Sequence, residues 1–218
     1  MSFISAFVYD RCMKSTEEAC LIDWRADLLK PVSGKVLEIG AGTGASLALY
    51  PQTEGLHLFL SEPDKNMRKQ LAAKVKLQQR KNVSILPCSS DSISAGDNEF
   101  DYVFASLVCC SINDVEAALK EIKRVLKPSG CFIFLEHVAA NKGSNRRKWQ
   151  NRINPIWKKL AGNCHLNRET EALIKGAGFT IENIQYESMR KAMPLVRPTI
   201  RGMARNSAYY HNDFFRKT

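Results

Sequence analysis

A glycine-rich turn follows directly on a short apolar stretch in the first quarter of the chain. The stretch KVLEI occupies residues 35–39, and the string GAGTG follows it at residues 40–44. Glycine lets a backbone turn sharply and approach a ligand closely, because a Cβ would collide there. A short helix expected just beyond the turn would add unpaired N–H donors. The pattern predicts a cofactor-binding turn, for S-adenosylmethionine or for a dinucleotide.

Two acidic residues near the turn indicate which parts of the cofactor could be bound there. Glu62 follows a second apolar stretch, and a carboxylate there can accept the hydrogens of both ribose hydroxyls of an adenosine. The spacing GxGxG, without the last glycine of GxGxxG, favours S-adenosylmethionine over NAD. Glu38 precedes the turn and can meet the ammonium of the methionine moiety, directly or through water. The alternatives are a helix N-terminal acid before Asp64 for Glu62, and a buried turn-stabilising carboxylate for Glu38.

Further candidates lie at the ends of later apolar stretches. Asp91 can accept a hydrogen from the adenine amine, or can cap a short exposed helix. Met67 can pack on adenine or in the core. The methyl group of a bound S-adenosylmethionine should point toward residues 105–107. The predicted cofactor-binding residues are Glu38, Gly40, Ala41, Gly42, Gly44, Glu62, Pro63, Met67, Ser90, Asp91 and Ser106.

Histidines are the candidate catalytic bases. A methyl acceptor often has to lose a proton to react, and a nearby His can take that proton. His137 ends an apolar stretch and His165 lies in the segment NCHLNRET, so both are candidates, with a structural hydrogen-bonded role as the alternative for each. Trp149 and Trp157 line an acceptor site or hold an insertion in place. None of the seven cysteines forms a CxxC pair, so we expect core cysteines and no metal site.

Apolar periodicity predicts alternating strands and helices. The predicted strands cover residues 35–39, 56–61, 83–87, 100–110, 131–138, 179–187 and 199–205, and the predicted helices 64–80, 114–126 and 167–175. Pro128 and Gly130 are expected to end the second helix, and Asn167 to cap the third. Residues 139–166 are basic and aromatic and show no clean period.

Strands joined by helices imply a mainly parallel α/β sheet covered on both faces. The length of 218 residues suits one domain. We divide it into an N-terminal helical segment (about 1–33), a cofactor-binding core (about 34–138), an acceptor-site insertion with a C-terminal hairpin (about 139–205) and a tail (206–218).

The formal net charge of +10 attracts polyanions or reflects a solvated basic face. No basic stripe is interleaved with aromatic residues, so a nucleic-acid partner is not expected. Residues 1–8 are too short for a secretory signal, and no stretch suffices for a membrane helix. The expectation is a cytoplasmic protein, with peripheral contact to anionic intracellular membranes as an open alternative. Nothing in the sequence fixes the oligomeric state.

Several strings identify a family resemblance over roughly residues 9–205. They are VLEIGAGTGASLALYP (36–51), FDYVFASLVCCSINDVEAALKEIKRVLKPSG (100–130), LEHVA (135–139), NPIWKKLAGNCHLNRET (154–170) and LVRPTIRGMA (195–204). With them the chain resembles class I methyltransferases of the ubiquinone/menaquinone-biosynthesis type. Within that group it is most similar to the animal methyltransferase-like subfamily known for alkyl thiol S-methylation.

The resemblance implies a Rossmann-like α/β fold with strand order 3-2-1-4-5-7-6 and strand 7 antiparallel. It also implies S-adenosyl-L-methionine as methyl donor and a small lipophilic acceptor. The subfamily usually carries an N-terminal membrane-anchoring helix, which we do not find here, and usually has Asp where this chain has Glu62. The predicted function is methyl transfer to a small-molecule thiol. The alternatives are N- or O-methylation of a small molecule, methylation of RNA or protein, and a non-catalytic cofactor-binding module.

Overall fold

A computed structural model describes residues 13–207 of the chain, and within them a seven-stranded sheet has the order β3-β2-β1-β4-β5-β7-β6. β1 to β5 run parallel, and β7 lies antiparallel between β5 and β6. The strands are β1 (Lys35–Ile39), β2 (His57–Ser61), β3 (Val83–Leu86), β4 (Phe100–Ser106), β5 (Leu126–His137), β6 (Phe179–Ser188) and β7 (Pro198–Asn206). The predicted strand order and direction are confirmed.

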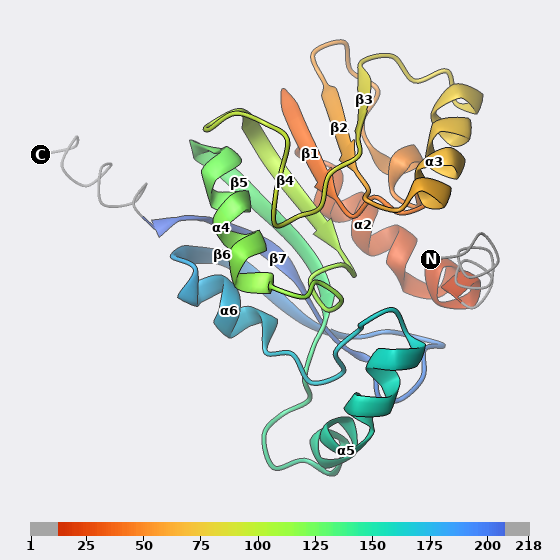
Figure 1. Cartoon of the computed structure of the whole chain (residues 1–218), viewed down its shortest axis with the longest axis vertical. Coiled ribbons are helices and arrows are strands. Elements are labelled where there is room, and N and C mark those ends of the chain that lie inside the picture. Colours follow the sequence, from red (N-terminus) through yellow and green to blue (C-terminus); the bar gives the residue numbers. More distant parts are fainter. Residues whose placement is uncertain (1–12, 208–218) are drawn as a thin grey trace, which may run out of the picture.

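Helices lie on both faces of this sheet (Figure 1). They are a π-helical turn η1 (Glu17–Leu21), α2 (Ile22–Leu29), a 3-10 turn η2 (Leu47–Leu49), α3 (Lys65–Leu77), α4 (Val115–Val125), α5 (Asn145–Leu160) and α6 (Thr170–Gly176). Side chains of α2 and α3 share one apolar core with one face of the sheet, and those of α4 and α6 share a second core with the other face. α5 stands apart, beyond one end of the strands (Figure 1).

The alternation along β1 shows how the two cores are separated. Val36 packs into the core on the α2 side, and Leu37 and Ile39 pack into the core on the α4 side. Successive side chains of a strand point to opposite faces, so Glu38 points toward α2. The last residues of β1, β2 and β4 meet at the carboxyl edge, where Ile39 is paired with both Ser61 and Ala105. Open α/β sheets bind ligands at this edge.

Two predicted boundaries around β4 and β5 are wrong. β4 ends at Ser106 instead of Cys110, because Leu107 adopts a positive φ of 56° and the chain turns away from the sheet. β5 begins at Leu126 and includes Pro128 and Gly130, which were expected to follow the helix as a loop. α4 does end at Val125, so the helix stop was placed within one residue.

The elements after β5 differ most from the prediction. Residues 145–160 form the helix α5 although Pro155 lies inside it. α6 begins at Thr170, and Asn167 does not cap it, since its amide donates to Oδ1 of Asn151 (2.9 Å). The expected helix after the glycine turn is only the three-residue turn η2.

Residues 1–12 and 208–218, which include most of the predicted tail, lie outside the described residues. No helix within residues 13–207 has both the length and the apolar character needed to cross a membrane.

Candidate active site

The glycine turn at the end of β1 is closed by backbone hydrogen bonds and leaves room on one side. Ala41 N donates to Ser61 O of β2, and Gly44 N donates to Ala41 O, both at 2.9 Å. Gly40 has φ 60°, and a Cβ there would lie 2.3 Å from the Val108 side chain. Gly42 has φ 57°, but a Cβ there would meet no atom closer than 4.0 Å. Packing therefore explains Gly40, whereas Gly42 borders open space that a ligand can fill.

Glu62 points at this turn, as predicted. Its Oε2 accepts from Gly42 N (2.9 Å), and its Oε1 accepts from Asp64 N (2.8 Å). Burial raises the pKa of the Glu62 carboxyl, and the two backbone N–H groups oppose that rise. Each carboxylate oxygen can accept a second hydrogen bond. The arrangement thus leaves acceptors for two ribose hydroxyls beside the bend.

Glu38 lies beneath the turn with protein partners. Its Oε2 accepts from the Tyr50 hydroxyl (2.9 Å), and only 4% of the residue is exposed. Burial raises the pKa of the Glu38 carboxyl to about 7, while hydrogen bonds from Ser46 and Tyr50 oppose the rise. These contacts match the alternative stated above, a buried turn-stabilising carboxylate, and leave its role toward the methionine ammonium a prediction.

Arg25 of α2 is a site residue that the sequence analysis missed. Its Nε donates to Ser106 Oγ at the end of β4 (2.8 Å), and its two terminal nitrogens donate to the Glu17 carboxylate. Only 4% of Arg25 is exposed, and its charge acts on Glu38. A cation at the carboxyl edge suits the carboxylate of an amino-acid ligand. In the sequence Arg25 lies between Asp23 and Asp27 in the helix IDWRADLL, and such a charged residue is usually assigned to a solvated helix face.

The remaining predicted cofactor residues are spread along the same edge. Met67 is buried in the first turns of α3. Pro63 is exposed, and its carbonyl accepts from Arg68 (2.6 Å). Ser90 is half-buried and Asp91 is exposed in the loop after β3, where Asp91 accepts from the Ser89 hydroxyl. Their proposed contacts with adenine remain predictions.

Glu136, near the end of β5, shapes the turn that follows β4. Its carboxylate accepts from the backbone N–H groups of Val108 (3.1 Å), Cys109 (2.9 Å) and Cys110 (3.4 Å), and it is fully buried. Burial raises its pKa, and these N–H donors oppose the rise. The contacts explain why β4 stops short of the cysteines: their N–H groups bond to a side chain instead of a neighbouring strand.

The two predicted catalytic histidines lie in the same region but in different surroundings. His137 is 4% exposed, and its Nε2 lies 2.9 Å from the Cys164 sulfur. Its Nδ1 is buried without a hydrogen-bond partner among the described residues. His165 is half-buried, and burial together with the charges of Arg168 and Lys158 lowers its pKa to about 4. His165 is therefore neutral at physiological pH but a weak base.

A segment at residues 163–168, which we call the cover, joins this region to the turn after β4. His165 N donates to Cys110 O (2.8 Å), Asn163 Nδ2 donates to Ser111 O (2.9 Å), and Arg168 donates to Cys109 O and Ile112 O. The insertion after β5 thus lies across the carboxyl ends of β4 and β5. This is the position expected of residues that enclose an acceptor.

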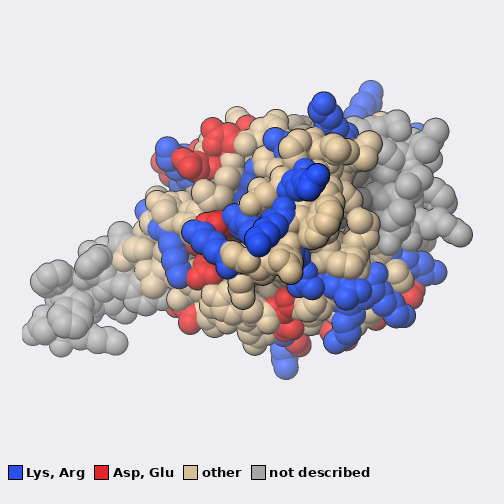
Figure 2. Space-filling model, turned by 90° about the horizontal axis from the view of Figure 1, so that it is seen from below, with Lys and Arg blue, Asp and Glu red and all other residues tan. Residues whose placement is uncertain are grey.

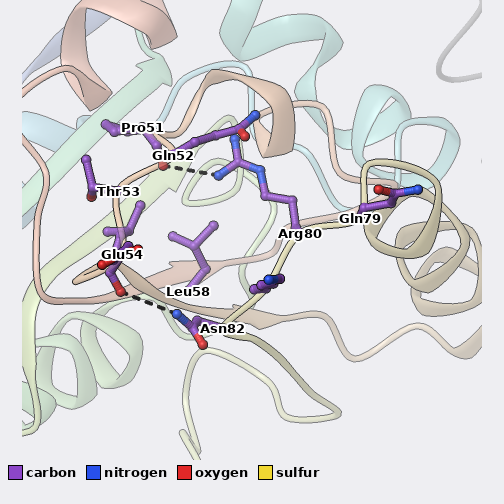
Figure 3. Close-up of a pocket in the computed structure, with 10 residues that line it drawn as sticks. Pro51, Gln52, Thr53, Glu54, Leu58, Gln79, Arg80 and Asn82 are labelled. Carbon is purple, nitrogen blue, oxygen red and sulfur yellow. Dashed lines mark hydrogen bonds between the residues drawn. The ribbon is translucent and has the colours of Figure 1, made fainter.

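Two hollows lie outside the glycine turn. One, of about 310 Å³, is lined by residues 51–54 and 79–82 at the amino ends of β2 and β3. Figure 3 shows Arg80 reaching across it toward Pro51, and Asn82 bonded to Glu54. It lies at the edge opposite the glycine turn. The other, of about 810 Å³, opens beyond β5, between residues 138–147 and α6.

The sheet order, the glycine turn and Glu62 together define a class I S-adenosylmethionine-dependent methyltransferase. The residues present fit the donor: Gly42 leaves space, Glu62 keeps free acceptor positions, and Arg25 supplies a buried cation. The methyltransferase-domain family matches residues 37–134. S-adenosyl-L-methionine is accordingly the cofactor of this enzyme.

Comparison with curated relatives identifies the family within this class of methyltransferases. The chain is 33% identical to thiol S-methyltransferase TMT1A of Homo sapiens over 79% of this chain and 71% of the relative. It is 37% identical to thiol S-methyltransferase TMT1B of Homo sapiens, covering 81% of this chain and 73% of the relative. The chain belongs to the family of these thiol S-methyltransferases.

Solved structures agree on the fold. The 4+2 cyclase SpnF superposes with a TM-score of 0.70 at 18% identity, over 85% of this chain and 79% of that one. Geranyl diphosphate methyltransferase in complex with SAM gives 0.68 at 12% identity, over 84% and 83%. Because one of these proteins is described as a cyclase, the fold alone does not fix the reaction.

Proposed function

We propose that this enzyme transfers the methyl group of S-adenosyl-L-methionine to the sulfur of a small lipophilic thiol. The observation that carries the proposal is the identity of 33–37% to thiol S-methyltransferases over more than 70% of their length. The cover, which is hydrogen-bonded across the turn after β4, supports a small acceptor rather than a macromolecule.

The chain's part in the reaction is alignment. The donor carries an activated methyl group on its sulfonium, so the protein has to hold nucleophile, methyl carbon and leaving sulfur in line. Glu62 and the bend at Gly42 fix the adenosine end at β1 and β2. The turn after β4, held by Glu136, places the acceptor side opposite them.

Proton removal from the thiol falls to one of the two histidines. His137 has one ring nitrogen beside Cys164 and the other without a partner among the described residues, so it has a position free to take a proton. His165 has a lowered pKa and accepts a proton less readily. The geometry therefore favours His137 as the base.

The experiment is incubation of the purified chain with deuterium-labelled methyl donor and a panel of alkyl thiols, amines and phenols, read by mass spectrometry. We expect the label on sulfur, with turnover of thiols at least tenfold above the other acceptors. Labelled amine or phenol products at equal or higher rates would contradict the thiol assignment while leaving the methyltransferase class intact. Binding of S-adenosylhomocysteine without any labelled product would support the non-catalytic alternative.

Histidine variants test the base. We expect His137→Ala to lower turnover of a thiol by about 10²–10⁴-fold, the usual contribution of a general base. His165→Ala should lower it much less. Both should bind S-adenosylhomocysteine like the parent chain in calorimetry. Unchanged turnover in both variants would rule out a histidine base.

We also propose that α5 lies against anionic lipid surfaces, where lipophilic thiols concentrate. Trp149, Ile156 and Leu160 are 54%, 64% and 80% exposed, and Ile153 is half-buried. At 3.6 residues per turn these four share one side of the helix. Arg146 and Lys159, together with Lys148 and Arg152, are exposed beside that side. Figure 2, seen from the end of the molecule at which α5 lies, shows Lys and Arg side chains over much of the surface.

Vesicle flotation tests this contact. The chain should float with vesicles containing a third phosphatidylserine and much less with pure phosphatidylcholine. Combined Trp149→Ser, Ile156→Ser and Leu160→Ser should weaken binding at least about tenfold, since each buried apolar side chain contributes roughly 1.5–3 kcal/mol. Leu77→Ser is the control, because Leu77 on α3 is 83% exposed but distant from α5 in sequence and fold. Equal binding by the triple variant and the control would refute the proposal.

A further inference from the structure

Three potential metal ligands from separate segments converge at the carboxyl edge. They are Cys110 in the turn after β4, His137 at the end of β5, and Cys164 in the cover. Their ligand atoms all lie within 4.8 Å of one another. This cluster could not be predicted from the sequence, because the two cysteines are far apart in the chain and form no CxxC pair.

We propose that Cys110, His137 and Cys164 form a binding site for a zinc ion. Two thiolates and one imidazole are a donor set that Zn²⁺ prefers, and the set Cys₂His occurs in zinc enzymes that leave the fourth position open. Tetrahedral coordination with ordinary Zn–S and Zn–N bonds places such ligand atoms about 3.5–3.8 Å apart. The 2.9 Å approach of His137 to Cys164 has to widen by about 0.6 Å to reach this range, and the other two separations already lie within 4.8 Å, so side-chain rotations suffice to form the site.

The backbone around the three ligands is already fixed without an ion. Glu136 accepts from the Cys110 N–H, and Cys110 O in turn accepts from the N–H of His165, the neighbour of Cys164. His137 is held in the sheet opposite Thr199 of β7. Preorganised ligands avoid the ordering cost that weakens a site formed only on binding.

The charges of the surroundings also suit a divalent ion. Two thiolates balance the charge of Zn²⁺, and the Arg168 guanidinium beside the cysteines faces the buried Glu136 carboxylate. Among residues 13–207 the imidazole has a hydrogen-bond partner only at Nε2, the nitrogen that faces the Cys164 sulfur. Zinc binding would therefore release the thiol protons and leave a region without net charge.

The zinc site is additional to the proposed methyl transfer. When zinc is bound, it excludes His137 as the base of that reaction. An imidazole that binds a metal through Nε2 carries its proton on Nδ1 and has no lone pair left to accept another, so His137 acts as a base only in the metal-free chain. The metal content of the enzyme used in the activity assays therefore has to be known. Metal binding itself is measurable without any acceptor, so its failure would leave the thiol proposal untouched.

The test is metal binding to the full chain kept in a non-thiol reductant. After removal of metal, we expect one equivalent of Zn²⁺ to bind in competition with a chromophoric chelator. Co²⁺ should give the sulfur-to-metal charge-transfer band and visible bands of a tetrahedral thiolate site. Cys110→Ala, Cys164→Ala and His137→Ala should each bind zinc about a hundredfold more weakly, at least as large a loss as removing an outer-shell support causes.

The matched control is Cys131→Ala, since Cys131 is a buried cysteine in the middle of β5 and outside the cluster. S-adenosylhomocysteine binding by each variant shows that it is folded. Less than a tenth of an equivalent of zinc, a cobalt spectrum without the sulfur band, or equal zinc affinity in Cys164→Ala and Cys131→Ala would each overturn the proposal. A Cys110–Cys164 disulfide in a chain that takes up no zinc after reduction would do so as well.

Discussion

At the residue scale, the methyl-donor site contains two carboxylates that differ in their hydrogen-bond partners and in their distance from the glycine turn. Glu62 is fixed by two backbone N–H groups and faces the glycine bend. Glu38 lies deeper and accepts hydrogen bonds from the hydroxyls of Tyr50 and Ser46. Burial raises both pKa values, but only Glu62 borders the space beside Gly42. We therefore expect Glu62 to govern cofactor affinity and Glu38 to govern the pH dependence of stability.

Replacement of Glu62 tests the first expectation. Glu62→Ala removes the acceptor of the ribose hydroxyls and should weaken S-adenosylhomocysteine binding by about 1–3 kcal/mol, the cost of hydrogen bonds to a charged group. Glu62→Asp keeps the carboxylate one methylene shorter and should lose less. Calorimetry measures both. An unchanged affinity in Glu62→Ala would disprove the ribose contact.

Replacement of Glu38 tests the second. A carboxyl whose folded pKa is raised from 4.5 to about 7 holds its proton in the folded chain where the unfolded chain has lost it. Stability should therefore fall as the pH rises through that window, by at most about 3 kcal/mol. Glu38→Gln, which is neutral at every pH, should remove the Glu38 share of this dependence, leave the share of Glu62 and Glu136, and be the more stable chain at pH 8. The measurement is the urea midpoint at pH 5 and pH 8, and a parent chain without the fall would contradict it.

At the element scale, most elements follow from the sequence, β6 and β7 among them to within one residue, and most of the misses lie between the end of β4 and the start of α6. β1 was predicted with its observed bounds, and α4 within one residue, because its apolar face at Val115, Leu119 and Ile122 is buried. α5 was missed, since Pro155 interrupts the pattern and the apolar side of the helix faces outward instead of a core. Local periodicity reports burial against the chain itself, and α5 has little of that.

The same limit applied to the candidate site. Spacing along the chain was enough to find the glycine turn and Glu62, because both lie directly after strands that form one edge. Arg25, Cys110 and Cys164 come from segments whose meeting depends on the tertiary fold. Glu136 could not be separated from an ordinary strand residue by sequence, since only the structure shows its carboxylate bonded to the turn after β4.

Gln150 is a buried side chain that joins α5 to the segments just after β5 and just before β7. It is fully buried, accepts from Ala140 N (2.8 Å), and donates to Leu195 O (2.8 Å) and Val138 O (3.3 Å). Gln150→Leu leaves these backbone groups unpaired, at about 1–3 kcal/mol for each one that stays buried. We expect a lower urea midpoint and slower methyl transfer with cofactor affinity unchanged.

The control for this variant is Gln52→Leu at an exposed loop position. It should change neither stability nor turnover. If Gln150→Leu were as stable and as active as Gln52→Leu, the hydrogen bonds of Gln150 would not be what holds α5.

At the scale of the whole molecule, the cofactor should stabilise the fold because it joins β1, β2 and α2. A ligand at one hundred times its dissociation constant adds about 2.7 kcal/mol to the free energy of unfolding. For a chain of this size we expect S-adenosylhomocysteine to raise the melting temperature by roughly 5–10 °C. Scanning fluorimetry measures the shift, with NADH as the comparison ligand. An equal shift with NADH would instead indicate a dinucleotide site.

The hydrogen bonds between the cover and the turn after β4 have an evolutionary consequence. Asn163 and Arg168 each donate to backbone carbonyls of residues 109–112, and a carbonyl is present whatever side chain its residue carries. Substitutions in the turn can therefore accumulate without loosening its attachment to the cover. The acceptor specificity can therefore change among related proteins while the residues that bind the methyl donor stay the same.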